Sequence, residues 1–572
     1  MLTPRAVVAG VVAGLLGLGA CSSEPRGAGS TTDDDEVTGA PSTTIAELPE
    51  ARSCPPPPAR GGAPGANVTA VDRDSYDLMS HDDVRLRVNF VPAVRVPAPT
   101  LLVSPGWASL GATLDTPSEA FAGSLAIDAL TRRGYNVVTW DRRGFGASDG
   151  VVALGDPAIE GGDVIAIVDW IATRPEVVLD GARDPRLGMF GGSYGAGIQL
   201  VAAAIDCRVD AIAPNMVTST WRNSLAKDDT TKVGWINLLV SSTDATLAPE
   251  LLTIAEIAND DGVLGAGELT YLDSLGPGAL VDAIEAPTLV VQGTVDTLFT
   301  LDDAIRVFER VRAGGGPAAM VWYCGGHGVC PTGRDDAWVA ERVVAWLDRH
   351  VRRIDARPGE LFTTVDQTGA HWSSDTWPLP VRASARGSGA GTLALVAASR
   401  AGPPAADDST AAGMANVMRL ITPALVASPH TLEADVEVAP DALIVGRPRL
   451  RLRYRGRADT PEAGTRPTRV FAQLVDPVSG AVVGGQITPI AVVLDGDDHE
   501  LAVDLEAVAW HAPDDGGSLV LQLVASTPLY TTPRLGGSIE FTAIDIELPD
   551  VGGSLHALGA VANDAAAPGA GR

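Results

Sequence analysis

The sequence predicts an α/β domain followed by an all-β domain, on three observations. Between residues 67 and 355, short apolar runs alternate with helical patterns, which is typical of a sheet covered by helices. Between residues 356 and 550, short runs of alternating apolar and polar residues follow one another without a helical pattern, which is typical of a β-sandwich. The 572 residues are also too many for one domain of usual size.

The composition is that of a folded and strongly acidic protein. Hydrophobic residues make up 45% of the chain and charged residues 20%, so the chain can build full cores. Asp and Glu number 71 against 42 Lys and Arg, which gives a formal net charge of −29. Lys227 and Lys232 are the only lysines. Because this charge repels phosphates, we expect no nucleic-acid partner.

The first 21 residues have the features of an export signal. Arg5 precedes an apolar run over residues 6–18, which is too short for a mature membrane span but suits a signal-peptide core. The run ends in Leu18-Gly19-Ala20-Cys21, which resembles a bacterial lipobox with Cys21 as the lipidated residue. The alternative is an ordinary secretory signal cleaved near Ala20. In either case we expect an exported protein. It is either anchored to the outer face of a bacterial cell membrane, which it then contacts only through the lipid, or secreted.

Residues 22–66 are rich in Ser, Thr, Gly, Pro and Asp, which predicts a flexible tether.

After export, Cys54, Cys207, Cys324 and Cys330 lie in an oxidising compartment, which favours disulfides over metal sites. Three pairings are possible. We favour Cys324–Cys330, which closes a short loop, and Cys54–Cys207 as the remaining pair. No Cys-x-x-Cys pair or His-rich cluster indicates zinc, and we expect no bound metal.

The α/β domain is read from apolar runs of strand length and from helical spacing. The last helix, over residues 335–350, places Val339, Val343, Trp346 and Leu347 on one face. Residues 218–284 have a polar helical pattern without a strand, which predicts a helical cap over the sheet. Strands are expected at residues 83–91, 100–103, 136–140, 186–190, 209–213, 287–292 and 318–323, and a further helix at residues 196–205.

A Gly-x-Ser-x-Gly motif lies between an expected strand and an expected helix. It reads Gly191-Gly192-Ser193-Tyr194-Gly195. The glycines allow a sharp turn that presents Ser193 at the edge of the sheet, and the helix N-terminus favours negative charge there. We therefore interpret Ser193 as a nucleophile.

A serine hydroxyl needs a base with an orienting carboxylate before it becomes reactive. His327 follows a strand, lies in a glycine-rich loop and comes after Ser193 in the chain, so we expect it to be the base. Asp296 lies just past a strand and is the expected acid. Asp302 and Asp303 compete for this role, but they lie where the next helix starts and acids serve as caps. The order Ser193, Asp296, His327 is that of the α/β-hydrolases.

An oxyanion hole needs two donors that point at the developing negative oxygen. The first expected donor is the backbone N–H of Tyr194, the residue after the nucleophile. The second is the backbone N–H of Trp107, in the loop Ser104-Pro105-Gly106-Trp107 that follows a strand. We interpret the glycines and charges of residues 141–148, in another loop after a strand, as scaffold at the edge of the site.

Over residues 83–352, these motifs resemble the Xaa-Pro dipeptidyl-peptidase (S15) and cocaine-esterase-like (CocE/NonD) branch of the α/β-hydrolases. The residues concerned are Asp141-x-Arg-Gly-x-Gly-x-Ser, Gly-Gly-Ser-Tyr-Gly, Gly-x-x-Asp and the His327 loop. The resemblance implies a serine hydrolase that forms an acyl-enzyme, with a cap that supplies the acyl pocket and a jelly-roll-like C-terminal domain. No cofactor is needed. Members of the branch often carry a Tyr in the loop after the third strand, whereas this chain has Trp107 there.

The all-β region shows alternation over residues 432–438 and 450–454, which predicts half-buried strands. A slip of the apolar phase between Ala543 and Ile544 predicts a bulge. We expect this sandwich to buttress the mouth of the active site rather than to bind carbohydrate. Residues 551–572 are expected to be a loose tail. Further strands are expected at residues 470–475, 490–494, 501–505, 519–524 and 539–548.

Three functions are compatible with this sequence. The sequence does not indicate an oligomeric state. An esterase or amidase needs an apolar acyl pocket. A dipeptidyl-peptidase also needs a carboxylate for the substrate ammonium group. The third alternative is a catalytically inert surface protein that binds through its sandwich. The pocket could be lined by Trp107, Trp221 and Trp235, and the cap carboxylates are Asp228, Asp229, Glu250 and Glu256. The expected partner of either enzyme is a small ester, amide or peptide.

Overall fold

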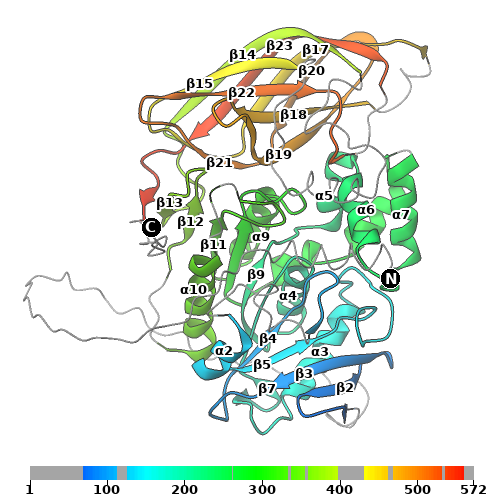
Figure 1. Cartoon of the computed structure of the whole chain (residues 1–572), viewed down its shortest axis with the longest axis vertical. Coiled ribbons are helices and arrows are strands. Elements are labelled where there is room, and N and C mark those ends of the chain that lie inside the picture. The colour runs from blue at the N-terminus through cyan, green and yellow to red at the C-terminus, as the bar shows by residue number, and fades with distance from the viewer. Residues whose placement is uncertain are drawn as a thin grey trace, which may run out of the picture.

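A computed structural model describes residues 68–111, 125–260, 262–330, 332, 336–354, 359–396, 431–461, 468–530 and 535–558 (Figure 1). The expected signal sequence with Cys21, the tether and Cys54 lie outside these residues. The structure contains an α/β domain and an all-β domain, as the sequence predicts, and in Figure 1 the all-β domain lies above the α/β domain. None of the helices in the described ranges combines the length and the apolar character that a membrane span requires.

The α/β domain is built on a 12-stranded sheet whose central strands run parallel. Those strands are buried on both faces, which explains why they appear in the sequence as continuous apolar runs. Their carboxyl ends meet at one edge of the sheet, where ligands bind in such folds. The central strands are, in spatial order, β5 (Asn136–Trp140), β4 (Thr100–Val103), β8 (Leu187–Gly192), β9 (Val209–Asn215), β10 (Thr288–Gly293) and β11 (Ala318–Tyr323).

Antiparallel strands extend the sheet at both sides. On one side these are β3 (Arg85–Val91), β2 (Ser75–Met79) and β1 (Val68–Ala70). The small hairpin of β6 (Leu179–Gly181) and β7 (Asp184–Pro185) lies apart from the sheet.

Helices cover both faces of this sheet (Figure 1). One face packs against α3 (Glu160–Ile171), α4 (Tyr194–Ile205) and α9 (Leu301–Ala313) in a shared apolar core. The other face packs against α2 (Ile127–Arg133) and α10 (Asp336–Leu347), which continues into the turn η4 (Asp348–Arg352). The expected helix face is confirmed, since Val339, Val343 and Leu347 are buried in that second core.

The described residues of 218–284 form helices and no strand, as expected for a cap. Cap side chains share a third core with residues of the loop that precedes α3 and with residues of the all-β domain, among them Phe471 and Tyr530. The cap is therefore wedged between the two domains (Figure 1). Its elements are α5 (Trp221–Leu225), η2 (Lys227–Asp229), α6 (Val233–Ser241), α7 (Pro249–Asp260), α8 (Ala266–Ser274) and η3 (Gly278–Ala283).

The all-β domain is an antiparallel sheet that encloses its own apolar core, so the expected sandwich-like fold is confirmed. The alternation seen in the sequence corresponds to alternating exposed and buried side chains, for example in β15 (Leu432–Val438). Its other strands are β14 (Ala383–Ala394), β16 (Leu443–Gly446), β17 (Arg449–Ala458), β18 (Thr468–Asp476), β19 (Ala481–Val492), β20 (Asp495–Asp504), β21 (Val508–His511), β22 (Gly517–Val524) and β23 (Gly537–Asp550).

The expected bulge is present in β23. The partner of Arg453 in β17 is Ala543, whereas the partner of Tyr454 is Phe541, so the register shifts between these two pairs. Two residues of β17 thus face three residues of β23. The additional residue of β23 is the bulge that the slip of the apolar phase between Ala543 and Ile544 predicts.

Two expected boundaries are wrong. The first sheet does not end at residue 355, because β12 (Phe362–Val365) pairs in parallel with β11 and β13 (His371–Ser374) pairs with β12. Residues 551–558 are not a loose tail, because β24 (His556–Ala557) pairs with β13. These strands have few residues and no clear apolar alternation, so their pairing was not visible in the sequence. Residues 559–572 lie outside the described part of the chain.

Candidate active site

Ser193 lies at the turn between β8 and α4. Its φ of 58° and ψ of −122° place a non-glycine residue in a strained conformation. The backbone N–H of Ser193 donates a hydrogen bond of 2.8 Å to the carbonyl of Asn215, at the end of β9. This is the strand–turn–helix geometry of a nucleophile elbow, and it presents the hydroxyl at the carboxyl edge of the sheet.

Two glycines of the motif are required by close packing. A Cβ atom added to Gly191 or to Gly195 would collide with the carbonyl oxygen of Ser104. The elbow therefore lies directly against the end of β4, and any larger side chain at these positions would push the two segments apart. Gly191 also has a φ of 141°, which L-residues rarely adopt.

The structure brings Ser193, His327 and Asp296 together. Ser193 Oγ lies 2.8 Å from Nε2 of His327, and Nδ1 of His327 lies 2.7 Å from Oδ2 of Asp296. Asp296 is fully buried and His327 is 7% exposed. The contacts have the order and the lengths found in a triad of hydroxyl, base and acid.

Asp296 is oriented by its own loop, residues 296–299, which we call the acid loop. Its Oδ1 accepts hydrogen bonds from the backbone N–H groups of Leu298 at 3.0 Å and Phe299 at 2.9 Å. Its Oδ2 accepts the backbone N–H of His327 at 3.1 Å in addition to the ring. A Cβ on Gly326 would lie 2.7 Å from the Cβ of Asp296, so only glycine allows the base loop to approach this closely.

The competing acids have other partners. Asp303 caps α9 and accepts hydrogen bonds from Ser219 and Asn223 of the cap region. Asp302 pairs with Lys227 and with Arg447. Both are structural, as their place at a helix start predicts.

The two expected oxyanion donors lie beside the elbow. Tyr194 is the first residue of α4, so its backbone N–H has no acceptor within the helix. The loop of Trp107 also approaches the elbow, since a Cβ on Gly106 would lie 3.6 Å from the carbonyl oxygen of Gly192. The role of the Trp107 N–H stays a prediction. Its indole N–H donates to the carbonyl of Leu239 in α6 at 3.1 Å, which ties this loop to the cap.

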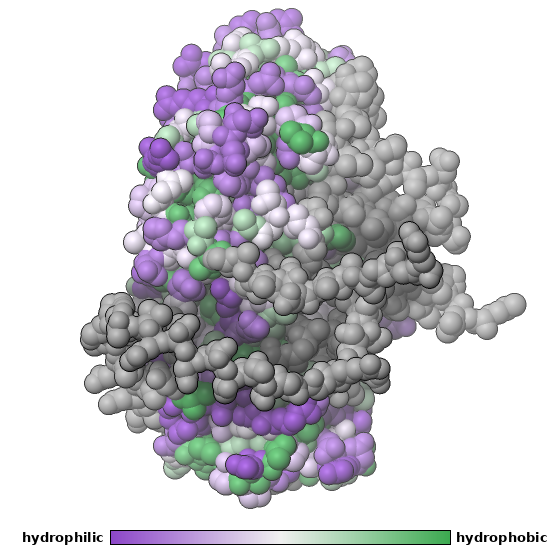
Figure 2. Space-filling model, turned by 60° about the vertical axis from the view of Figure 1, so that its left-hand side comes forward, coloured by the Kyte–Doolittle hydropathy of each residue, from purple (hydrophilic) through white to green (hydrophobic). Residues whose placement is uncertain are grey.

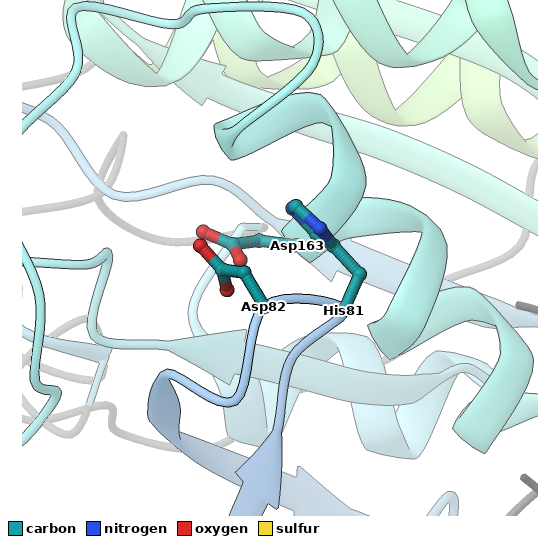
Figure 3. Close-up of side chains that lie close together, drawn as sticks. All are labelled: His81, Asp82 and Asp163. Atoms are coloured by element: carbon teal, nitrogen blue, oxygen red, sulfur yellow. The ribbon is translucent and has the colours of Figure 1, made fainter. Parts of the chain in front are cut away.

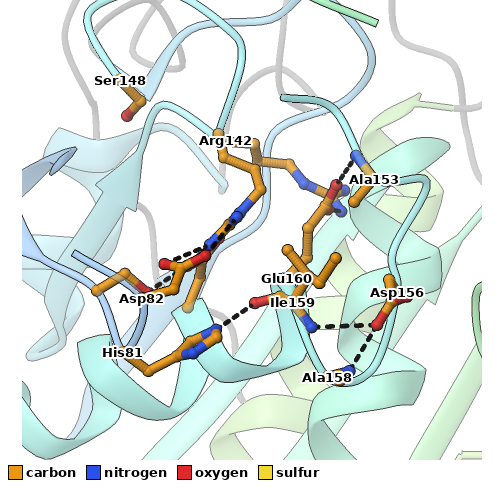
Figure 4. Close-up of polar contacts among 12 residues, drawn as sticks. His81, Asp82, Arg142, Ser148, Ala153, Asp156, Ala158, Ile159 and Glu160 are labelled. Carbon is orange, nitrogen blue, oxygen red and sulfur yellow. Dashed lines mark hydrogen bonds and ion pairs between the residues drawn. The ribbon is translucent and has the colours of Figure 1, made fainter. Parts of the chain in front are cut away.

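Arg142 and Glu160, which lie close together in Figure 4, form a buried group with Tyr194 of the elbow. The Arg142 guanidinium lies 3.4 Å from the Tyr194 ring centroid, donates to the Tyr194 carbonyl at 2.6 Å and pairs with Glu160. The Tyr194 hydroxyl donates to Glu160 at 2.6 Å, and burial raises the pKa of Tyr194 well above its usual value. Glu160 was not predicted, because no motif marks it. The scaffold role expected for the loop over residues 141–148 agrees with these contacts.

Next to this group, His81, Asp82 and Asp163 gather on one side of α3 (Figure 3). Within the described residues, this is the one set of His, Cys, Asp and Glu side chains close enough to share a metal ion. The Arg143 guanidinium already bonds both carboxylates, to Asp163 at 2.6 and 2.7 Å and to Asp82 at 2.9 and 3.1 Å. The acids therefore act as counterions that fix the Arg143 loop.

Aromatic side chains surround the base. The rings of Trp235 and Phe299 meet the His327 imidazole edge-on, with centroids 5.5 and 5.3 Å away. Trp221 lies 5.9 Å from Phe299, and Trp107 lies 5.2 Å from Tyr194. Of the three tryptophans expected to line a pocket, Trp235 thus contacts the base directly, and the pocket itself stays a prediction.

The structure does not bring the expected cap carboxylates to the triad. Asp228, Glu250 and Glu256 face solvent. Asp229 pairs with Arg222 at 2.8 Å on the surface of the cap. In the described chain, Asp296 is the carboxylate that is bonded to the base.

The disulfide expected between Cys324 and Cys330 is present, with a Cα–Cα distance of 5.3 Å. It closes the loop that carries His327. Cys207 is also disulfide-bonded. Because Cys54 lies outside the described residues, its pairing with Cys207 stays a prediction.

Comparison with known proteins agrees with this geometry. Residues 82–259 match the family model described as X-Pro dipeptidyl-peptidase (S15 family). An uncharacterised 31.7 kDa protein from the traX–finO intergenic region of Escherichia coli is 36% identical over 89 residues, 16% of this chain. The match spans 29% of the length of that relative.

Solved structures show the same fold at low sequence identity. A CocE/NonD family hydrolase from Staphylococcus aureus aligns with a TM-score of 0.56 at 13% identity, over 84% of this chain and 96% of its own. An aminopeptidase from a marine sediment Thaumarchaeota archaeon aligns with a TM-score of 0.61 at 14% identity, over 88% and 98%. An α-amino acid ester hydrolase aligns with a TM-score of 0.62 at 11% identity, over 83% and 96%.

The chain thus shares the fold of solved structures described as a CocE/NonD family hydrolase and an α-amino acid ester hydrolase, and residues 82–259 match the S15 family model. The resemblance seen in the sequence is thereby confirmed.

Proposed function

We propose that the protein is a serine hydrolase that cleaves a small ester or amide through an acyl-enzyme on Ser193. The observation that carries this proposal is the continuous contact from Ser193 Oγ through the His327 imidazole to the Asp296 carboxylate. A hydroxyl in this arrangement can lose its proton to the base as it attacks a carbonyl carbon.

Each step of the reaction follows from these contacts. His327 Nε2 takes the proton of Ser193 Oγ while Oγ forms its bond to the acyl carbon, and Asp296 stabilises the imidazolium. The N–H of Tyr194 and the proposed N–H of Trp107 receive the negative charge on the carbonyl oxygen. His327 then protonates the leaving alcohol or amine. Finally it takes a proton from water as the water oxygen attacks the acyl carbon, and it returns that proton to Ser193 Oγ as the bond between Oγ and the acyl carbon breaks.

Among the substrate classes, we favour an ester or amide with an apolar acyl group. The supporting observation is the aromatic environment of the base, made by Trp235 and Phe299, with Trp221 behind Phe299. A dipeptidyl-peptidase would need a carboxylate near the site to bind an ammonium group. The cap acids considered for that role are solvent-facing or paired with Arg222.

The experiment compares turnover of acyl p-nitrophenyl esters of increasing acyl length with turnover of Xaa-Pro-p-nitroanilides. We expect ester hydrolysis with a burst of one p-nitrophenol per enzyme, and Ser193→Ala should abolish it. Faster cleavage of the Xaa-Pro-anilides would instead assign the dipeptidyl-peptidase activity. No turnover of either class by folded protein would favour the inert surface protein.

We also propose that the protein is exported and anchored to the outer face of a bacterial membrane through lipid on Cys21. The support is the sequence Leu18-Gly19-Ala20-Cys21 after an apolar run. Radiolabelled palmitate should be incorporated into the wild-type protein and not into Cys21→Ala. Cleavage near Ala20 without lipid would indicate a secreted protein.

A further inference from the structure

Three consecutive backbone carbonyls of the acid loop are held by side chains from outside the α/β sheet. Gln486 Nε2 donates to the carbonyl of Asp296 at 2.9 Å. Lys232 Nζ donates to the carbonyls of Thr297 and Leu298, both at 3.0 Å. Lys232 precedes α6 of the cap, and Gln486 belongs to β19 of the all-β domain.

These two side chains are buried where they make these bonds. Lys232 is 1% exposed and Gln486 is 5% exposed. Burial of an ammonium or an amide group costs free energy unless its hydrogen bonds are satisfied. Breaking these hydrogen bonds would therefore be costly, which keeps both side chains in place. Burial lowers the pKa of Lys232, while the nearby charges of Glu506, Asp303 and Asp296 act in the opposite direction.

The carbonyls that Lys232 holds belong to the peptide groups that orient the catalytic acid. The Thr297 carbonyl shares a planar peptide group with the N–H of Leu298, and the Leu298 carbonyl shares one with the N–H of Phe299. Both N–H groups donate to Oδ1 of Asp296. Because each peptide group is rigid, fixing its carbonyl also fixes the direction in which its N–H points. A cation on the carbonyl further polarises each N–H, which strengthens its bond to the carboxylate.

Further contacts fix the approach of both domains to the acid loop. Trp235 Nε1 donates to Thr297 Oγ1 at 3.1 Å, one turn after Lys232. A Cβ on Gly484, beside Gln486 in β19, would lie 2.6 Å from the carbonyl oxygen of Thr294. Gln486 also donates to the carbonyl of Gly484 at 3.0 Å, which sets its own rotamer.

We propose that Lys232 and Gln486 are positioning residues for Asp296, so that the cap and the all-β domain both set the geometry of the catalytic acid. This inference rests on the proposed hydrolase function. The all-β domain then does more than support the mouth of the site, because Gln486 contacts the backbone carbonyl of Asp296 itself.

The test uses paired substitutions in the full-length protein. Gln486→Met removes the donor without placing a charge in the interior. Its control is Gln473→Met, because Gln473 is equally buried in the sandwich and donates to Gln522 at 2.8 Å instead. We expect Gln486→Met to lower kcat for an acyl p-nitrophenyl ester by about fivefold or more with KM within about twofold. Lys232→Met should lower kcat further, by about 100-fold, because it releases two peptide groups.

The pH profile separates positioning from general damage to the fold. A misplaced carboxylate stabilises the imidazolium less, so the acidic limb of kcat/KM should move to lower pH in Gln486→Met and Lys232→Met. The low-field NMR signal of the His327 Nδ1 proton should move upfield in both variants. The control Gln473→Met should move neither, even if its unfolding temperature falls.

Two results would decide against the inference. If Gln486→Met matches Gln473→Met in kcat, pH limb and NMR signal, the sandwich does not position Asp296. If Lys232→Met folds and keeps the wild-type pH limb and NMR signal, Lys232 has no such role. Failure of the proposed function is distinguishable, because the wild-type protein would then turn over no ester while the NMR comparison still reports on the His327–Asp296 contact.

Discussion

Asp296 is distinguished from its acidic neighbours by what it touches. It accepts hydrogen bonds from the His327 ring and from the N–H groups of the acid loop, whereas Asp302 and Asp303 pair with groups of the cap and the sandwich. In the proposed mechanism it holds the imidazole in the tautomer that accepts a proton at Nε2. Amide oxygens could also accept the backbone N–H groups, but an amide at this place would allow the wrong tautomer.

We therefore predict that Asp296→Asn lowers kcat by about 10³- to 10⁴-fold with little change in KM, as an uncharged partner does in other triads. The measurement is steady-state hydrolysis of an acyl p-nitrophenyl ester. Asp303→Asn should keep kcat within about tenfold of wild type. If Asp303→Asn lost as much activity as Asp296→Asn, the catalytic acid would be wrongly assigned.

The buried carboxyl group of Asp210 should make the free energy of unfolding depend on pH. Burial raises its pKa from 3.8 to about 7, although it accepts the N–H of Leu187 and lies 3.2 Å from Arg353. Between these two values the folded state holds a proton that the unfolded state has lost. The free energy of unfolding therefore falls as pH rises from about 4 to 7, by at most about 1.4 kcal/mol per pH unit from this group.

Asp210→Asn should flatten this fall, because an amide keeps an acceptor for Leu187 and does not titrate. Urea unfolding at several pH values in this range measures the slope. A variant whose unfolding free energy declines as steeply as that of wild type would show that another group is responsible; Asp184, with a pKa raised to about 6 by burial, is the first to examine.

At the scale of elements, the strands that the sequence predicts best are those with continuous or alternating apolar residues. β4, β5, β11 and β15 have the predicted bounds, since burial alone determines them. β14 was missed because its Gly, Ser and Ala residues show no alternation. It forms a strand because its neighbours β15 and β23 pair with it, and a Cβ on Gly387 would lie close to the backbone of Asp435. Such pairing partners lie far away in the sequence.

The triad was predictable from the sequence, because each member follows a strand and the carboxyl ends of parallel strands meet. Lys232, Gln486 and Glu160 were not, because they come from segments whose placement depends on how whole domains pack. Lys232 could have been noticed as one of only two lysines in a chain rich in arginine. No pattern around Gln486 indicates that it reaches the acid loop.

The Cys324–Cys330 disulfide is the element-scale device that restrains the base. It closes the glycine-rich loop of His327, and Cys330 is partly exposed and hence open to thiol reagents. We predict that reduction lowers kcat severalfold, because a longer free loop places the imidazole less well. Ester hydrolysis is measured with and without reductant, and mass spectrometry confirms that the bond has opened.

The matched control is Cys324→Ser with Cys330→Ser, which should show the lower rate in both conditions. Unchanged activity of wild-type protein after verified reduction of this bond would contradict the role given to it.

At the scale of the whole molecule, three units meet at one buried ionic cluster. Lys227 of the cap lies 3.1 Å from Glu506 of the all-β domain and 3.6 Å from Asp302 of the α/β domain, which also pairs with Arg447. On the face shown in Figure 2, hydrophilic residues predominate and apolar side chains are scattered in small groups. The cluster thus fixes the relative placement of the three units.

Both lysines are buried at this junction, with exposed fractions of 6% for Lys227 and 1% for Lys232. We predict that an amine-reactive ester modifies neither lysine in native protein and both in denaturant, as read by peptide mass spectrometry. The denatured sample serves as the control for reagent activity. Rapid modification of Lys232 under native conditions would show that the junction opens, and the acid loop would then lack a permanent anchor.

The central claim is that the hydroxyl at position 193 is made reactive by the imidazole at position 327. It is tested most directly by mapping the site of covalent modification with a fluorophosphonate probe. We predict one modified residue, Ser193, with labelling slowed at least 100-fold in a folded His327→Ala variant and absent in Ser193→Ala. Labelling of another residue, or equal labelling rates with and without the imidazole, would contradict the account.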